Sequence, residues 1–308
     1  MANWESIKMH IPVLLKESTE CLNPKQGDVI LDATINGGGH SEEMLKMIGE
    51  KGKLIGIDQD DEVLNKLKKK WKDRKNILLA RDNFRNLDKV LESLKIEKIN
   101  GALFDIGVSS SQIDESGRGF SFQKDEPLLM TMKSRIEPDD LTAKEIVNIW
   151  SEKDLADTIW KYGEERFSRR IAKNIVRRRK AKKFETTMEL VDAIRESVPS
   201  FYRNGRKINC ATRTFQALRI AVNDELGALK EGMEKAWSFL QGGGSLAVVS
   251  FHSLEDRIVK NYFKELAAKN EGKIMAKKPI VPTEEEKKAN PRSRSAKLRA
   301  IKKYDQGH

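Results

Sequence analysis

Three aspartates each end a short apolar run: Asp32, Asp58 and Asp105. Such runs are typical of buried strands, and an open parallel sheet binds its ligands beyond the carboxyl ends of its strands. Asp58 ends the second run, where an acid can accept hydrogen bonds from both ribose hydroxyls of a nucleoside cofactor. Together the three acids predict a nucleoside-cofactor site at one edge of a sheet.

A glycine-rich turn, residues 36–40 (Asn-Gly-Gly-Gly-His), follows the first acid and lets the backbone come close to a ligand. A dinucleotide site requires the spacing G-x-G-x-x-G, which this turn does not have. Asp32 at the start of the turn would also repel a pyrophosphate, whereas it suits a ligand that carries an ammonium and a sulfonium. The sequence therefore favours S-adenosylmethionine over a nicotinamide cofactor. We expect Ser41 to cap the helix that follows.

Strands and helices alternate around these residues. The four expected strands are residues 29–32, 53–58, 77–80 and 101–105. This order predicts an α/β fold, a parallel sheet with helices on both faces. Later in the chain the pattern predicts one long helix at residues 214–240 and a turn of three glycines at residues 242–244. A strand at residues 245–250 and a closing hairpin, made of residues 274–281 and 296–301, are expected to follow.

Residues 113–212, between the two α/β parts, show no convincing strand. They include amphipathic stretches at residues 143–149 and 155–162. We therefore expect a helical insertion, a candidate RNA-recognition domain, in a cofactor-binding domain made of residues 1–112 and 213–308.

The chain has 308 residues, with 58 Lys and Arg against 47 Asp and Glu, which gives a net charge of +11. This excess favours a polyanionic partner, most often a nucleic acid. Residues 166–183 hold ten basic residues and no acid. Five of the ten recur at three- and four-residue steps and predict one cationic helix face opposite an apolar stripe: Arg166, Arg169, Arg170, Lys173 and Arg177.

Residues 287–303 form a second acid-free segment, with eight basic residues. Arginines among small polar residues suit contacts to phosphate, so we expect RNA contacts from both segments. The candidates in the second segment are Arg292, Arg294 and Lys297. Trp150 and Trp160 in the insertion are candidate stacking residues, with packing in the core as the alternative for each.

Composition excludes several classes of protein. No stretch approaches the ~20 apolar residues of a transmembrane helix, and the first residues show no signal peptide. Cys21 and Cys210 are too few for a disulfide framework or a zinc site, and we expect two reduced thiols. These features predict a cytoplasmic protein with no metal and no membrane association.

Motifs along nearly the whole chain resemble the bacterial small-subunit rRNA cytosine-N4 methyltransferase family, known as RsmH or MraW. In order they are HIPVLL (10–15), GGGHS (37–41), DIGVSSSQ (105–112), RGFSF (118–122), YGEE (162–165), ATRTFQALRI (211–220), SFHSLEDR (250–257) and NPRSRSAKLR (290–299). The resemblance implies transfer of a methyl group from S-adenosylmethionine to the N4 amine of a decoding-site (P-site) cytidine. The implied partner is 16S rRNA or the small ribosomal subunit. The implied fold is a Rossmann-like class I methyltransferase sheet with an inserted all-helical domain, in agreement with the pattern of elements.

The resemblance carries cofactor contacts to seven positions of this chain: Gly38, Gly39, His40, Asp58, Phe84, Asp105 and Gln112. Phe84 lies where a ring can cover the adenine, with a core aromatic as the alternative. The chain also departs from the family's pattern. The usual Pro-Leu-Asp-Met-Arg-Met lacks its acid and its base, because Leu129 and Thr131 stand there. Asn36 replaces a glycine, and Asn209 with Cys210 replaces a His-Pro pair.

The exocyclic amine of cytosine is a poor nucleophile because its lone pair is delocalised into the ring, so much of the catalysis can be positioning. A carboxylate or carbonyl that accepts an N4 hydrogen would help the nitrogen to rehybridise. We assign this role to Asp105 and to the backbone near Ser109, with His252 close by after the fifth strand. His252 is a candidate proton acceptor, RNA contact or orienting residue, and the sequence does not rank these.

Two other functions stay open at the level of sequence. A non-catalytic or weakly active RNA-binding relative of the methyltransferases would keep both basic segments and tolerate the departures at Leu129 and Thr131. A nicotinamide-dependent enzyme fits the alternating elements but explains neither basic segment. The sequence also leaves open whether the chain is a monomer or a homodimer, and whether the substrate is naked rRNA or an assembled subunit.

Overall fold

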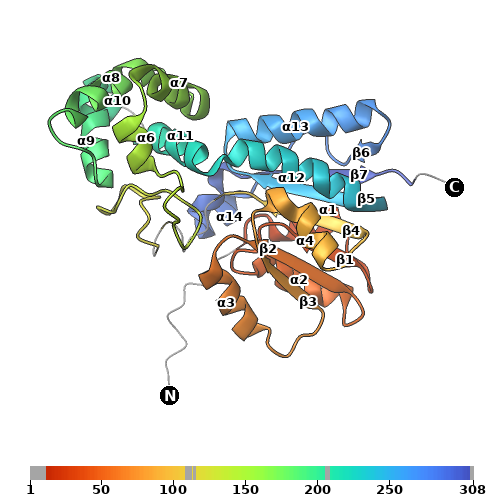
Figure 1. Ribbon diagram of the computed structural model, residues 1–308. Coiled ribbons are helices and arrows are strands. Elements are labelled where there is room, and N and C mark those ends of the chain that lie inside the picture. Colours follow the sequence, from red (N-terminus) through yellow and green to blue (C-terminus); the bar gives the residue numbers. More distant parts are fainter. Residues whose placement is uncertain (1–11, 108–112, 114–115, 205–208, 306–308) are drawn as a thin grey trace. The chain divides into compact units, whose positions relative to one another are not determined.

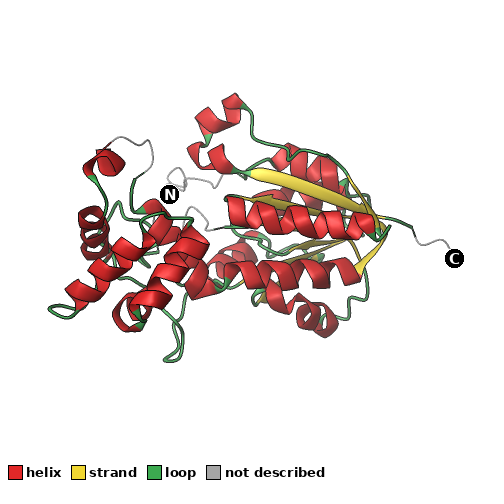
Figure 2. Cartoon of the chain, turned by 90° about the horizontal axis from the view of Figure 1, so that it is seen from above, coloured by secondary structure: helices red, strands yellow, loops and turns green. Residues whose placement is uncertain are grey.

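The computed structural model describes residues 12–107, 113, 116–204 and 209–305. The chain packs as two units. The sheet unit is Met1–Gly107 with Leu226–His308, and the helical unit is Val108–Glu225. We expected the chain to re-enter the sheet unit at residue 213, but the helical unit extends to Glu225. It includes one more helix, α11 (Thr212–Asn223), because α11 packs against α7 (Glu152–Gly163) of the helical unit. All strands of the described chain (yellow in Figure 2) belong to the sheet unit.

The sheet has seven strands in the order β3-β2-β1-β4-β5-β7-β6. Their bounds are β1 Val29–Asp32, β2 Lys53–Asp58, β3 Ile77–Arg81, β4 Ile99–Asp105, β5 Leu240–Ser250, β6 Gly272–Ile274 and β7 Lys297–Lys303. The strands β1 to β5 pair in parallel, and β7 runs antiparallel to both of its neighbours, β5 and β6. The predicted parallel sheet and α/β fold are thus confirmed.

Helices cover both faces of this sheet, because successive residues of each buried strand point to opposite sides. Leu103 and the strand residues that point to the same face of the sheet pack against helices α1 (Leu15–Leu22), α2 (Gly39–Ile48) and α3 (Asp61–Lys70). Phe104 and its counterparts pack on the other face, against α4 (Leu87–Ser93), α12 (Glu225–Phe239) and α13 (Ser253–Ala268) (Figure 1).

Three expectations for the later part of the chain are wrong. The expected helix over residues 214–240 is two helices, α11 and α12, because Asp224 takes a left-handed conformation with φ 43° between them. The expected glycine turn at 242–244 lies inside β5, next to an irregularity in its pairing with β4. The first strand of the closing hairpin ends at Ile274, and only Ile280 of the following residues bridges to β7.

A short helix and a 3-10 turn, α14 (Glu284–Ala289) and η3 (Pro291–Ser295), precede β7. The second basic segment therefore runs from the end of α14 through η3 into β7, as a folded part of the sheet unit. The expected strand at 296–301 is confirmed within β7.

The helical unit contains α6 (Ala143–Ile149), α7, α8 (Ser168–Arg179), α9 (Thr187–Ser197), α10 (Ser200–Asn204) and α11. Its own core includes Ile146, Leu155, Ile171, Leu190 and Leu218, each fully buried. In the described part of residues 113–212, β-type pairing amounts to one bridge between Pro127 and Thr186. Among the residues with described positions, no helix is long and apolar enough to cross a membrane.

Candidate active site at the carboxyl ends of the strands

The three predicted acids end three adjacent parallel strands, β2, β1 and β4. Asp32 pairs in register with Gly56 of β2 and Leu103 of β4, so Asp58 and Asp105 each lie two residues farther along their strands. From β1 the chain adds β2 and β3 on one side and β4 and β5 on the other. Ligands of open α/β sheets bind at this change of direction, and the acids lie there as predicted.

Asp32 is buried at the end of β1 and is bonded on both carboxylate oxygens. The Ser41 hydroxyl donates to Oδ2 at 2.6 Å, and the Thr34 N–H lies 3.3 Å from Oδ1. Burial still raises the pKa of Asp32 to about 6. The expected N-cap role of Ser41 is wrong: Gly38 is the N-cap of α2, and Ser41 is a buried residue of its first turn.

Asp58 holds the glycine-rich turn to the end of β2. Its Oδ2 accepts the Asn36 N–H at 3.1 Å, and its Oδ1 accepts the Asp60 N–H at 2.9 Å. Burial raises the pKa of Asp58 to about 6. Asn36 takes a left-handed φ of 45°, which Asn tolerates better than most residues, so its replacement of the family's glycine is accommodated.

Gly38 and Gly39 both lie where a side chain would not fit. A Cβ on Gly38, which has φ 73°, would come within 2.6 Å of the Trp71 ring. A Cβ on Gly39 would come within 2.9 Å of the Pro12 ring. The neighbouring rings therefore favour glycine at both positions, and the cofactor contacts assigned to the two glycines stay predictions.

His40 lies between the N-terminal turn and Asp105. Its Nε2 is 3.1 Å from the Val13 carbonyl oxygen, and since a carbonyl only accepts, Nε2 carries the hydrogen. Its Nδ1 faces Asp105 Oδ2 at 3.6 Å, a distance that exceeds a hydrogen bond. The structure thus places His40 beside Asp105, and the cofactor contacts assigned to both residues stay predictions.

Asp105 has an unusual environment for a carboxylate. Its Oδ1 is buried and has no hydrogen-bond partner among the described residues. Burial, together with the carboxylates of Asp32 and Glu255, raises the pKa of Asp105 to about 8. A cation placed beside Asp105 would favour the ionised carboxylate.

His252 is the N-cap of α13. Its Nδ1 accepts the Glu255 N–H at 3.4 Å, while its Nε2 lies 3.1 Å from Glu255 Oε1 but out of line for a hydrogen bond. The buried Glu255 accepts the N–H groups of Phe251 and His252 in return. Sequence reasoning missed Glu255, although a capping residue followed by Glu three positions later is a recognisable signal.

Phe84 begins the short 3-10 turn η2 (Phe84–Asn86) directly after β3. Its ring packs edge-on against Phe104, with the centroids 5.6 Å apart, and is half-buried. This placement at the carboxyl edge of the sheet is compatible with both the cofactor and the core interpretation. Ser109 and Gln112 lie outside the described residues.

The predicted cationic helix face is confirmed for Arg169, Arg170, Lys173 and Arg177 on α8, with Ile171 and Ile175 buried, whereas Arg166 lies before the helix begins. Arg169, Arg170 and Lys173 are exposed. Arg177 is also exposed, but it donates to Asn174 Oδ1 at 2.6 Å and lies 3.8 Å from Glu196 of α9. Acids of α9 thus partly neutralise a segment that contains none itself.

Arg166 precedes α8 and lies over aromatic rings. Its guanidinium carbon is 4.8 Å from the ring centroid of Phe167, 5.0 Å from that of Tyr202 and 5.8 Å from that of Phe201. Phe201 in α10 is 64% exposed. An exposed ring beside an arginine is typical of surfaces on which nucleobases stack. Sequence reasoning missed Phe201 because its partner, Arg166, precedes it by 35 positions.

In the second basic segment, Arg292 and Arg294 are exposed on η3. Lys297 lies in β7, where its Nζ is 3.2 Å from Asp256 Oδ2. Arg299 donates to the other oxygen of Asp256 at 2.6 Å. Lys297 is therefore engaged in an ion pair within the sheet unit.

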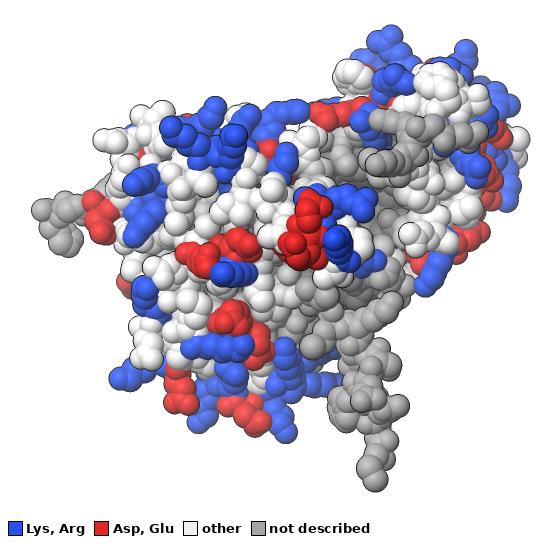
Figure 3. Space-filling model, turned by 180° about the vertical axis from the view of Figure 1, so that it is seen from behind, with Lys and Arg blue, Asp and Glu red and all other residues white. Residues whose placement is uncertain are grey.

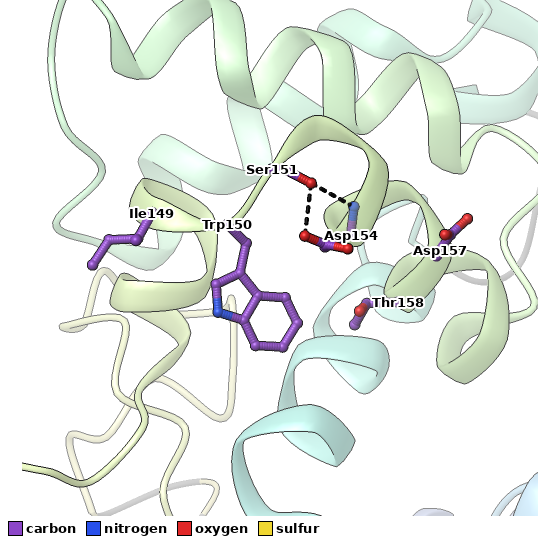
Figure 4. A pocket seen from close by; sticks show the side chains of 6 residues that line it. All are labelled: Ile149, Trp150, Ser151, Asp154, Asp157 and Thr158. Carbon is purple, nitrogen blue, oxygen red and sulfur yellow. Dashed lines mark hydrogen bonds between the residues drawn. The ribbon is translucent and has the colours of Figure 1, made fainter.

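Trp150 lines an open pocket of the helical unit, with Ile149, Ser151, Asp154, Asp157 and Thr158 (Figure 4). Trp150 is partly buried and packs against the core of this unit. This placement agrees with the alternative interpretation of Trp150 as a core residue. Trp160, by contrast, is 59% exposed. Because the pocket is lined by two aspartates, it is unsuited to phosphate.

The departures from the family's pattern are accommodated locally. Thr131 is buried, and its hydroxyl lies 3.3 Å from the Lys133 N–H that it accepts. The Leu129 carbonyl accepts the Ala143 N–H at 3.0 Å. Asn209 Oδ1 accepts the Ala211 N–H at 2.9 Å, and Cys210 is a buried free thiol, as is Cys21.

Comparison with known proteins identifies the family. The model of the MraW methylase family matches residues 7–304. The protein named ribosomal RNA small subunit methyltransferase H of Clostridium botulinum (strain Kyoto / Type A2) is 46% identical, over 96% of this chain and 98% of its own. The protein of the same name from Sulfurihydrogenibium sp. (strain YO3AOP1) is 50% identical, over 94% of this chain and 97% of its own.

Among solved structures, an rRNA methylase from Streptococcus thermophilus aligns with a TM-score of 0.44 and 13% identity, over 94% of each chain. Aeropyrum pernix fibrillarin, solved with S-adenosyl-L-methionine, aligns with a TM-score of 0.38 and 15% identity, over 90% of this chain and 67% of its own. The family match extends over nearly the whole sequence, both units included, and leaves no support for a nicotinamide-dependent enzyme. The chain belongs to the MraW methylase family.

Proposed function

We propose that this chain is an S-adenosylmethionine-dependent 16S rRNA (cytosine-N4)-methyltransferase. Its proposed target is the decoding-site (P-site) cytidine, number 1402 in the usual rRNA numbering. The observation that carries the proposal is the set of acids Asp32, Asp58 and Asp105 at the ligand-binding edge of the sheet, of which Asp32 and Asp105 are buried. Family membership and the names of the relatives support the class of reaction.

The residues at this edge fit a cationic nucleoside cofactor. A cation bound near these acids would lower their raised pKa values. The lone pairs of Asp58 that its backbone hydrogen bonds leave unused suit ribose hydroxyls, and the half-buried Phe84 ring suits an adenine face. When bound, S-adenosylmethionine supplies a methyl group on a positively charged sulfur, which is a strong electrophile.

The chain's own residues then have to position the amine and take up its hydrogen. We assign to Asp105 the acceptance of an N4 hydrogen bond, which helps N4 to rehybridise as it attacks. His252 follows β5, the strand beside β4, and its bond to the Glu255 N–H fixes its ring. This geometry favours an orienting role for His252. The backbone near Ser109 and the side chain of Gln112 remain proposed contacts.

The target base has to leave any stacked helix to reach the cofactor, so the RNA is single-stranded, looped or flipped at that position. The proposed backbone contacts are Arg166, Arg169, Arg170, Lys173 and Arg177 of the helical unit, with Arg292, Arg294 and Lys297 of the sheet unit. Of these, we expect Arg177 and Lys297 to contribute least, because each is bonded within the protein. Phe201 is proposed as a stacking residue.

Mass spectrometry of 16S rRNA tests the function directly. Cells without this gene are expected to lose one N4-methylcytidine, and the wild-type gene but not the Asp105→Asn variant is expected to restore it. Retention of every N4-methylcytidine in the deletion strain would contradict the proposal. Methylation by the purified protein of naked rRNA or of the assembled small subunit, compared side by side, identifies the cytoplasmic substrate.

The alternative is a non-catalytic or weakly active RNA-binding relative, which the departures at Leu129 and Thr131 would favour. Calorimetry with S-adenosylmethionine separates the two, because only the enzyme needs to bind it. The intact acids argue for the enzyme. Sedimentation of the purified chain distinguishes a monomer from a homodimer.

A further inference from the structure

The N-terminal turn before α1 and the short helix α14 have no role in the proposed chemistry so far, yet they are bonded to each other. Leu14 is fully buried and takes a left-handed φ of 54° at the start of α1. Its backbone N–H donates to Glu286 Oε1 at 2.8 Å, across 272 positions of sequence. Both residues belong to the sheet unit.

The same turn contacts the candidate active site. The Val13 carbonyl, which belongs to the peptide group that carries the Leu14 N–H, accepts the hydrogen bond from His40 Nε2 at 3.1 Å. The ring of Pro12 packs against Gly39, where an added Cβ would come within 2.9 Å of it. The far side of the His40 ring faces Asp105 Oδ2 at 3.6 Å. One peptide group therefore links Glu286 to His40, and His40 adjoins the buried acid.

We propose that Glu286 is a positioning residue for the methyl-transfer site. Glu286 holds the Val13–Leu14 peptide group in place and thereby maintains the orientation of His40 toward Asp105. This inference rests on the proposed function, because it takes the site at Asp105 to be where the cofactor binds.

Local features suit Glu286 to this role. Within many helices, a Glu three residues after the N-cap accepts the N-cap N–H, and the N-cap residue of α1 makes no side-chain cap bond of its own. Glu286 supplies that acceptor from a distant segment, and its negative charge lies near the positive end of the α1 dipole. Its own place is fixed because the Glu286 N–H donates to Thr283 Oγ1 at 3.2 Å.

Calorimetric titration with S-adenosylmethionine and with its demethylated product tests the proposal on three variants. Glu286→Ala is expected to weaken binding on the order of tenfold, because it frees the turn. Glu286→Gln keeps an oxygen that accepts the Leu14 N–H and is expected to retain most of the affinity. Glu284→Ala removes an exposed acid from the same helix, where it pairs with Lys287, and is expected to bind as the wild type does.

A double-mutant cycle with His40→Ala separates positioning from general destabilisation. If Glu286 acts through His40, the double variant Glu286→Ala, His40→Ala is expected to bind no more weakly than His40→Ala alone. Additive losses in the cycle would overturn the proposal, as would wild-type affinity of Glu286→Ala.

If Glu286→Ala fails to fold, hydrogen exchange at the Leu14 amide of the wild type and of Glu286→Gln tests the proposal instead. The amide is expected to be protected in the wild type and in Glu286→Gln, and rapid exchange in the wild type would contradict the bond. A wild-type protein that binds no S-adenosylmethionine would refute the proposed function itself, a result distinct from all of these.

Discussion

At Asp105, proton binding and cofactor binding compete for the same carboxylate. With its pKa raised to about 8, Asp105 holds a proton at neutral pH in the free protein, whereas a neighbouring cation favours the ionised form. We therefore predict that affinity for S-adenosylmethionine rises between pH 6 and pH 9 and that binding at pH 7 releases protons. Calorimetry in two buffers of different ionisation enthalpy measures that release.

The matched variant for this pH dependence is Asp105→Asn, whose side chain has no proton to release. We expect it to bind more weakly and to lose the part of the pH dependence that lies near pH 8. Wild-type binding that is independent of pH across this range, with no proton released, would show that the cofactor is not placed beside Asp105.

Removing the carboxylate of Asp105 or the ring of His252 is predicted to slow the chemical step. If Asp105 accepts the N4 hydrogen bond, single-turnover methylation by Asp105→Asn is expected to fall on the order of 10²-fold or more, at saturating cofactor. His252→Ala is expected to fall less, because His252 orients rather than reacts. Asp139→Asn, at an exposed acid of the helical unit, serves as the control. Unchanged rates in both site variants, with cofactor binding intact, would refute the assignment.

At the scale of elements, the cationic face of α8 can be tested through salt. On a single strand, each phosphate contact that is lost reduces the slope of log affinity against log salt by roughly 0.7. We predict this reduction for Arg169→Ala and for Lys173→Ala, measured by fluorescence anisotropy with a single-stranded rRNA fragment. Arg177→Ala is the matched control on the same helix, with a smaller effect expected because Asn174 and Glu196 already engage that side chain. Equal slopes for all three variants and the wild type would contradict the role of this face.

The ring of Phe201 is predicted to act in a different way from these cations. Stacking of one base contributes about 1–3 kcal/mol and depends little on salt. Phe201→Ala is therefore expected to lower affinity at every salt concentration while the slope stays that of the wild type, and Phe201→Trp is expected to preserve binding. A slope that falls in Phe201→Ala would mean that the substitution disturbs Arg166 instead.

Elements whose signals are local were predictable, and those that depend on a single backbone conformation or on distant contacts were not. The acid-ended strands follow from apolar runs, and the placement of Asp58 beside Asp32 follows from parallel pairing. The break at Asp224 depends on one left-handed residue, and many other residues could have continued the helix. The contact of Glu286 with Leu14 joins the two ends of the chain, and no pattern within either segment indicates it.

At the scale of the whole molecule, the net charge of +11 does not form one uniform surface. In the face seen in Figure 3, Lys and Arg side chains are spread widely, with groups of Asp and Glu between them. Pairs such as Arg299 with Asp256 leave the net charge unchanged, but they engage the basic side chain within the fold. The positions of the exposed arginines therefore matter more for RNA binding than the net charge.

The buried acids also predict how the stability of the whole protein changes with pH. Asp32, Asp58 and Asp105 bind protons more tightly when folded than when unfolded, since their pKa values rise from 3.8 to about 6, 6 and 8. The folded state then holds more protons between pH 4 and pH 8, so the free energy of unfolding falls as pH rises through that window. Each unit of pKa difference corresponds to about 1.4 kcal/mol, and a loss of several kcal/mol is expected. Acids whose pKa is lowered in the fold, such as Asp256, change the free energy of unfolding only at pH values below this window.

Thermal unfolding of the free protein from pH 5 to pH 8.5 measures this loss as a falling transition midpoint. Asp105→Asn is expected to flatten the decline above pH 6, and Asp139→Asn to leave it unchanged. Saturating S-adenosylmethionine is expected to raise the midpoint more at pH 8 than at pH 6, because a bound cation stabilises the ionised acids and the folded state together. A midpoint that rises steadily with pH would show that the three carboxyls are ionised in the free fold, and the charge-deficient site proposed for the cofactor would then not exist.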